Sequence, residues 1–309
     1  MLNISIKNAK EFLDLFYKPE IDSHELTKKT KLSLFVLRID GGRFAYENMK
    51  KQLGNAAVTY VFSRTQFDQI RPAQMHESVK KVQDSFRDWS VNDGEGGELF
   101  LYCLLETHLN APKILSKMEM KTAGNDYIKG SDGIHLLSLD NGVFHLIFGE
   151  SKMIGDSTEK GSSFRKAIRA AFESVKEVET NGIGGEISLV DSNLMKETYD
   201  EETLKFLRKI INPSARDVSV YKFNAFGIFI GFEIDISDWN LQEMEDVDFE
   251  KKLKEEIRVA VEGKYEYIKE QITAQNLSGY HFYIYAIPFI KNGEINIDTT
   301  RKDLIKHIQ

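Results

Sequence analysis

The chain has 309 residues, of which 41% are hydrophobic, 11% are aromatic and 29% are charged. This composition is typical of a folded globular protein and excludes a disordered or collagen-like chain. The formal net charge of −7 excludes a protein coated in basic residues, although it permits a local basic groove. The only cysteine, Cys103, excludes an internal disulfide and a cysteine-based zinc site.

The apolar runs of the chain are short. The longest, residues 99–105, 226–232 and 284–290, fall far below the roughly 20 residues that a membrane-spanning helix needs. The stretch MLNISIKNAKEFLDLFYKPE does not have the basic, apolar and small-residue regions of a secretion signal. We therefore expect a cytoplasmic protein that makes no membrane contact.

The first ninety residues contain both strand-like and helix-like patterns. Residues 32–39 and 56–63 are rich in β-branched and aromatic residues, which favours strands. Residues 75–89 instead place apolar side chains at helical intervals. We predict that residues 1–90 form an N-terminal α/β region.

From residue 91 onward, helical and strand-like segments follow one another. A glycine-containing loop at 91–98 leads into a helix that carries Glu98, and the sequence Asn141-Gly142 predicts an antiparallel hairpin because both residues tolerate positive φ. The hairpin strands are expected at 130–139 and 142–152, followed by a helix at 162–178, a strand at 220–236, a long helix at 247–275 and a strand at 281–289. This order predicts an α/β domain over residues 91–309.

Acidic and basic residues interrupt the apolar pattern at three places in this domain. Glu98 heads an otherwise apolar stripe of its helix, and Asp132 opens the first hairpin strand. Glu150 and Lys152 end the second hairpin strand on one face. We therefore expect these four side chains to form one polar site.

Three carboxylates and a lysine suit the metal-assisted hydrolysis of a phosphodiester. Asp132 and Glu150 offer the hard oxygen ligands that Mg²⁺ or Mn²⁺ prefers. Glu98 would complete the metal shell or accept a hydrogen bond from a metal-bound water. Lys152 would orient the attacking water or stabilise negative charge that develops during cleavage. We predict that all four residues are catalytic.

The motifs around these residues carry a family resemblance. Helical Glu98, Asp132 in GSDG, and Glu150-x-Lys152 in FGESK resemble the core of the PD-(D/E)xK nucleases, although no proline precedes Asp132. The segments GELFLY, GSDGIH and FGESKM more closely resemble the HamA family of the Hachiman antiphage defence system. The resemblance implies a restriction-endonuclease-like core, with a mixed sheet flanked by helices, and a metal-dependent DNA nuclease whose partner is the helicase HamB.

Two alternatives remain open from the residues alone. The chain could be a non-catalytic DNA-binding or helicase-regulating subunit that retains a nuclease fold, or it could cleave RNA by the same metal chemistry. Arg165, Lys166 and Arg169 lie on the predicted helix after the hairpin and are candidates for DNA phosphate contacts. The alternative for that helix is a solvated amphipathic face. His135 and His145 are expected to be hydrogen-bonded histidines and not zinc ligands.

Overall fold

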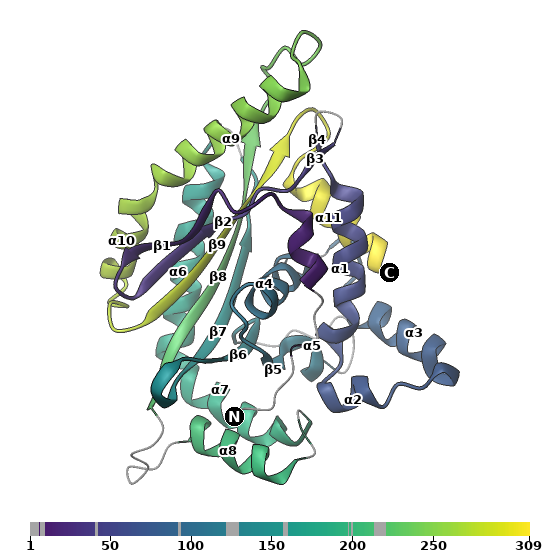
Figure 1. Ribbon diagram of the computed structural model, residues 1–309, viewed down its shortest axis with the longest axis vertical. Coiled ribbons are helices and arrows are strands. Elements are labelled where there is room, and N and C mark those ends of the chain that lie inside the picture. The colour runs from purple at the N-terminus through teal and green to yellow at the C-terminus, as the bar shows by residue number, and fades with distance from the viewer. Residues whose placement is uncertain are drawn as a thin grey trace.

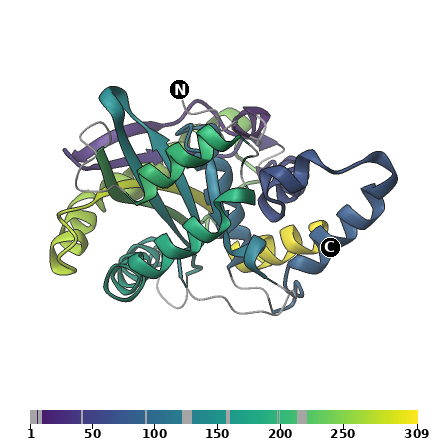
Figure 2. The same cartoon turned by 90° about the horizontal axis from the view of Figure 1, so that it is seen from below.

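The computed structural model describes residues 6, 10–40, 43–91, 94–121, 130–156, 160–196, 198, 200–212 and 221–309. Its centre is a seven-stranded sheet with the strand order β1-β2-β9-β8-β7-β6-β5, and a separate two-stranded sheet pairs β3 with β4. Helices cover both faces of the large sheet, as Figure 1 and Figure 2 show. The predicted α/β class, with a mixed sheet flanked by helices, is therefore confirmed.

The strands are β1 (Ile21–Thr27), β2 (Thr30–Leu34), β3 (Ile39–Asp40), β4 (Arg43–Phe44), β5 (Lys113–Ser116), β6 (Gly133–Ser138), β7 (Val143–Met153), β8 (Tyr221–Asp235) and β9 (His281–Lys291). The α-helices are α1 (Tyr46–Val61), α2 (Arg64–Asp68), α3 (Met75–Ser85), α4 (Glu95–Thr107), α5 (Lys117–Met120), α6 (Ser163–Asn181), α7 (Ile183–Asn193), α8 (Glu201–Ile211), α9 (Asp246–Glu262), α10 (Tyr265–Ala274) and α11 (Ile297–Ile308). Short 3₁₀ helices are η1 (Lys10–Leu15), η2 (Pro72–Gln74), η3 (Asp140–Gly142) and η4 (Leu194–Lys196).

The sheet is mixed because its centre is parallel and its two edges are antiparallel. Strands β2, β9, β8 and β7 run parallel to one another. The β1–β2 pair and the β5–β6 and β6–β7 pairs are antiparallel. Parallel strands in the middle of a sheet must be covered on both faces, which explains their continuous apolar sequences.

Aromatic side chains of β8 show how the two layers of helices attach. Phe229 stacks on Phe100 of α4, with the ring centroids 5.2 Å apart. Phe232, which points to the opposite face, stacks on Phe164 of α6, with the ring centroids 4.3 Å apart. Helix α4 thus covers one face of the central strands and α6 covers the other.

Helix α4 is buried on nearly all sides, since α1 and α11 pack on it from outside. Two glycines in its first turn permit close packing. A Cβ on Gly97 would lie 3.2 Å from Ser151 Oγ of β7, and a Cβ on Gly96 would lie 3.3 Å from Leu304 of α11. These contacts fix the beginning of α4, and therefore Glu98, against the middle of the sheet.

The β6–β7 hairpin forms as predicted. Asn141 and Gly142 have φ values of 59° and 72°, in the left-handed region that the Asn-Gly pair tolerates. The resulting register places Ile134 opposite Phe148, and the backbone N–H of Asp132 donates to Gly149 O at 2.8 Å. Asp132 therefore lies beside the stretch of β7 that carries Glu150.

The strand expected at 32–39 ends at Leu34 in β2, and two further elements differ from the structure. Residues 56–61 belong to α1 and not to a strand, because Met49, Leu53 and Tyr60 recur at helical spacing and are all buried. The long helix expected at 247–275 is two helices, α9 and α10, since the chain leaves helical geometry at Lys264, where φ is −113° and ψ is 2°.

The N-terminal region shares the large sheet with the rest of the chain. Strand β2 pairs with β9, so residues from the predicted 1–90 and 91–309 regions lie in one sheet. The domain boundary at residue 90 stays a prediction.

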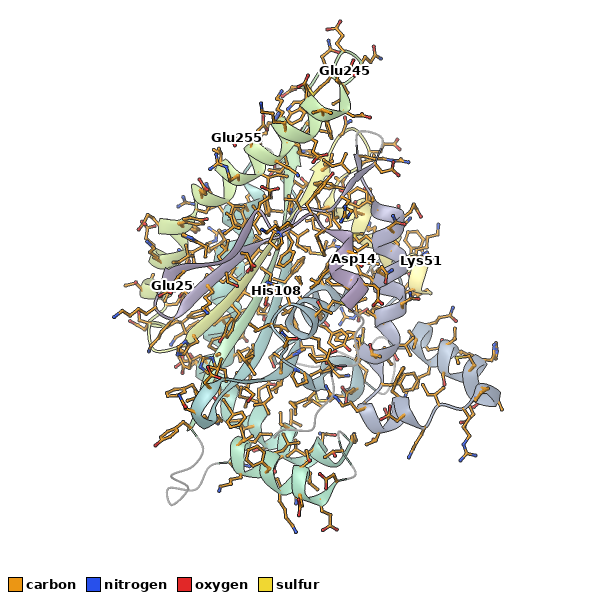
Figure 3. All side chains as sticks on the ribbon, viewed as in Figure 1. Asp14, Glu25, Lys51, His108, Glu245 and Glu255 are labelled. Carbon is orange, nitrogen blue, oxygen red and sulfur yellow. The ribbon has the colours of Figure 1, made fainter. Side chains whose placement is uncertain are left out.

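Helices α2 and α3 extend from the side of the molecule (Figure 2). Figure 3 shows the acidic side chains of Glu255, on α9, and Glu245, directly before this helix, at the outer edge. None of the helices in the described part of the chain has the length and apolar character needed to cross a bilayer.

Candidate functional site

The four predicted site residues line one pocket. Glu98, Asp132, Glu150 and Lys152 meet at a cavity of about 490 Å³ between β7 and helices α4, α6 and α7. Elements separated widely in the sequence thus bring three carboxylates and a lysine together. The other lining residues are Gly94, Lys117, Gly130, Ser151, Ser174, Glu177, Val178, Gly182, Gly185, Glu186 and Leu189.

Asp132 is held through both of its carboxylate oxygens. Lys117 Nζ donates to Oδ1 at 2.8 Å, and the backbone N–H of Ser151 donates to Oδ2 at 2.7 Å. The sheet explains the first contact, because Ser116 pairs with Gly133 and thereby places the next residue, Lys117, beside Asp132. The side chain of Asp132 is only 8% exposed, so its position is well defined.

Glu150 and Lys152 form an ion pair along β7. Lys152 Nζ donates to Glu150 Oε1 at 2.6 Å, and both side chains point to the same face because they are two residues apart. Glu150 is buried, whereas the Lys152 side chain is 28% exposed toward the pocket. The ammonium group therefore lies between the buried carboxylate and the open part of the cavity.

Glu98 enters the pocket from the first turn of α4. Its Oε2 accepts a hydrogen bond of 3.0 Å from the hydroxyl of Tyr60, which is buried in α1. A carboxylate in the first turn of a helix also interacts favourably with the positive end of the helix dipole. Tyr60 thus fixes the orientation of Glu98 from the side opposite the sheet.

Burial and the charge of Asp132 raise the pKa of two glutamates in the pocket. Burial, followed by the negative charge of Asp132, raises the pKa of Glu98 to about 8. The same two causes raise the pKa of Glu150 to about 7, although Lys152 opposes them. Such shifts indicate an excess of negative charge in a poorly solvated place, which a bound cation would relieve.

The donor set fits a hydrated hard cation. In the part of the chain that the structure describes, no three His, Cys, Asp or Glu side chains are arranged to enclose a metal ion. Mg²⁺ is usually held by one or two carboxylates and keeps several waters, so a complete protein cage is not required. Asp132 and Glu150 could supply these carboxylates, with Glu98 as a third oxygen donor or a partner of a water.

A buried glutamate of α7 holds the turn that carries Asp132. Glu186 accepts hydrogen bonds from Ser131 N at 2.9 Å and from Ser131 Oγ at 2.8 Å. Gly130 makes the approach possible, since its φ is +121° and a Cβ there would lie 2.0 Å from Glu186 Oε1. Glu186 is therefore a positioning residue for the Asp132 turn.

The structure does not bring the predicted DNA-binding residues to this pocket. The guanidinium of Arg165 lies over the ring of Tyr267, 4.0 Å from its centroid. Lys166 Nζ donates to Ser162 Oγ at 2.8 Å, and Arg169 Nε lies 3.8 Å from an oxygen of Glu173. Helix α6 lines the pocket with later residues, namely Ser174, Glu177 and Val178.

Sequence reasoning missed three residues of the site: Lys117, Tyr60 and Glu186. Lys117 follows a strand of only four residues, and Tyr60 lies in a segment that favoured a strand, so neither could be placed beside the carboxylates. Glu186 lies in a helix that was not predicted. No motif marks these residues in the sequence, and only their tertiary contacts identify them.

The two strand histidines have hydrogen-bond partners, as expected. His135 Nδ1 lies 2.8 Å from Ala111 O, and His145 Nδ1 lies 2.9 Å from the hydroxyl of Tyr283. Burial lowers the pKa of His135 to about 3 and that of His145 to about 4. Cys103 is completely buried in α4, so the structure gives it no access to solvent.

A comparison with protein families gives a match over most of the chain. No curated protein matches the chain at a significant level. The family model described as HamA, however, matches residues 10–308, which is nearly the whole chain and includes every residue of the pocket. The chain therefore belongs to the HamA family, the family of the Hachiman antiphage defence system.

Proposed function

We propose that this protein is a metal-dependent DNA nuclease with a PD-(D/E)xK core that acts in Hachiman defence together with the helicase HamB. The meeting of Asp132, Glu150 and Lys152 in one pocket, with Glu98 beside them, is the observation that carries the proposal. The order of these residues along the chain supports a core of this type, as do their positions on a helix, directly before β6 and on the adjacent strand β7. We further propose a cytoplasmic location, where phage DNA would be met.

In the proposed reaction, Asp132 and Glu150 would hold Mg²⁺ or Mn²⁺, and Glu98 would contribute a third oxygen or orient a water. The bound ion would supply Lewis-acid polarisation of the phosphate and would lower the pKa of a bound water. Lys152 lies beside Glu150 at the open side of the cavity, where its ammonium can orient the attacking water or stabilise charge on the phosphate. Tyr60 and Glu186 keep Glu98 and the Asp132 turn in place.

The direct test is cleavage of supercoiled and linear DNA with Mg²⁺ or Mn²⁺, with and without the helicase and ATP. Lys152→Ala and Glu150→Gln should each reduce cleavage about a hundredfold or more while the fold and partner binding remain. Lys160→Ala is a suitable control because that side chain is 51% exposed and lies outside the pocket. An RNA substrate in the same assay tests the alternative that the protein cleaves RNA.

A non-catalytic subunit is the second candidate. The observation that favours it is that Asp132 and Glu150 each bind a lysine, so both carboxylates have a partner without a metal. Such a subunit would bind DNA or the helicase and would support phage defence equally well with Glu150→Gln or Lys152→Ala. Full protection by both variants in cells would therefore reject the nuclease and support this candidate.

A further inference from the structure

Lys117 has no role in the pattern that predicted the site, yet it is central to the charge balance of the pocket. Its ammonium binds Asp132 Oδ1 at 2.8 Å, and its side chain is 18% exposed. Lys152 binds Glu150 instead, so the two lysines neutralise different carboxylates. Lys117 therefore occupies the side of Asp132 that faces the cavity, where a metal ion would have to bind.

The positive charge of Lys117 interacts with all three carboxylates of the pocket, those of Asp132, Glu98 and Glu150. Burial by itself would lower its pKa, but the charges of Asp132, Glu98 and Glu150 outweigh burial and raise it. The charge of Lys117 in turn opposes the rise in the pKa of both Glu98 and Glu150. One ammonium group thus interacts with the same three carboxylates that a divalent cation would contact.

Contacts that do not involve the Lys117 side chain hold the backbone around it. Ser116 pairs with Gly133 in the sheet, its hydroxyl caps α5 by accepting from Glu119 N at 3.3 Å, and its Oγ also donates to Tyr60 O at 3.0 Å. The second oxygen of Asp132 keeps its hydrogen bond from Ser151 N. The long lysine side chain can therefore leave Asp132 without disturbing the strands.

We propose that Lys117 is an internal counter-ion of this site and that a divalent cation displaces its ammonium from Asp132. This inference rests on the proposed function, because it assumes that the carboxylates bind a metal. In the metal-free protein, Lys117 neutralises the charge of Asp132 and so part of the negative charge of the cluster, which makes metal binding an exchange of cations. The released ammonium remains in the same cavity, where it can contact a phosphate of the substrate.

Metal affinity provides the first test, with Mn²⁺ as the probe and electron paramagnetic resonance of free Mn²⁺ as the readout. Removing a competing, partly exposed ion pair in Lys117→Met should tighten Mn²⁺ binding about fivefold. Lys117→Arg keeps the charge and should retain the affinity of the wild type, as should the surface control Lys160→Met. Unchanged or weaker binding in Lys117→Met would overturn the exchange.

The second test uses the wild-type protein and does not depend on the folding of any variant. An amine-acylating reagent is applied with and without Mn²⁺, and the modification of each lysine is measured by mass spectrometry. Labelling of Lys117 should rise with Mn²⁺ because the amine is released from Asp132, while labelling of Lys160 should stay constant. Equal labelling of Lys117 in both conditions would show that it is not displaced.

These results separate the exchange from the nuclease proposal. Mn²⁺-dependent release of Lys117 without any cleavage of DNA or RNA would support the exchange and reject the nuclease. Cleavage that requires Mn²⁺, with unchanged Lys117 labelling, would support the nuclease and reject the exchange. Absence of Mn²⁺ binding to the wild type would overturn the exchange, whereas the cleavage assay would still decide the nuclease.

Discussion

Glu186 accepts two hydrogen bonds from Ser131, although the two residues lie 55 positions apart in the chain. Both residues are buried, at 6% and 3% exposure, and Asp132 follows Ser131 directly. Helix α7 therefore does more than cover the pocket, since it determines where the turn presents Asp132. Any change that weakens this contact should affect both stability and the geometry of the carboxylate cluster.

Glu186→Ala should lower the free energy of unfolding by about 2–3 kcal/mol, because the buried N–H and hydroxyl of Ser131 lose their acceptor. Urea unfolding, followed by circular dichroism, measures the change. Glu201→Ala is the matched control, since its side chain is 86% exposed and its ion pair with Lys205 should contribute little. Equal stability of the two variants would contradict the positioning role of Glu186.

Lys113→Met should be more damaging, at about 3–5 kcal/mol, because it breaks a buried ion pair and leaves one charge unpaired. Lys113 is 2% exposed, lies 2.5 Å from Glu119 Oε1 and donates to the carbonyl oxygens of Thr59, Tyr60 and Phe62 at the end of α1. Thermal and urea unfolding would measure the loss. Adding Glu119→Gln to the variant removes the unpaired charge and should restore part of the stability.

The stability of the metal-free protein should fall as the pH rises from about 6.5 to about 8.5, above the range in which the lowered pKa values of His135 and His145 oppose the effect. The folded-state pKa values of Glu150 and Glu98, about 7 and about 8, lie above the ordinary value of 4.5. The folded state therefore binds more protons than the unfolded state in this range, and the free energy of unfolding decreases with pH. Unfolding midpoints across this range measure the slope. Glu98→Gln should make it shallower, and an unchanged slope would argue against a raised pKa at Glu98.

Charge reversal on α6 tests the predicted DNA contacts. If the outer face of this helix binds phosphates, Arg165→Glu with Arg169→Glu should weaken DNA binding and reduce its dependence on salt concentration. Fluorescence anisotropy at several salt concentrations gives both quantities. Lys205→Glu on α8 is a control with similar exposure, since its side chain is 76% exposed. Unchanged binding would support the alternative of a solvated amphipathic face.

The elements that carried strong local signals could be predicted from the sequence. The β6–β7 hairpin formed because Asn141 and Gly142 adopt the positive φ that they tolerate, and the apolar runs of β8 and β9 formed the centre of the sheet. The site residues on these elements then met in one pocket because the hairpin register places Asp132 beside β7. Local pattern and tertiary structure agreed at these positions.

Other parts depended on contacts that the sequence does not show. Tyr60 and its neighbours have strand-like side chains but form a helix, because one face of α1 is buried against the body of the protein. Lys117 lies after a short strand that pairs with β6, so its approach to Asp132 follows from the pairing of strands and not from the spacing of residues in the sequence. The carboxylates were therefore predictable, whereas their supporting residues were not.

The position of β9 between β2 and β8 has a consequence for the synthesis of the chain. The ribosome makes the β1–β2 hairpin early, yet the strand that joins this hairpin to the centre of the sheet begins only at His281. Until β9 emerges, β2 and β8 each present an open edge to which another chain can pair. Long-range pairing of this kind slows folding and exposes nascent chains to aggregation. The nascent protein should therefore need protection by chaperones until β9 has emerged from the ribosome.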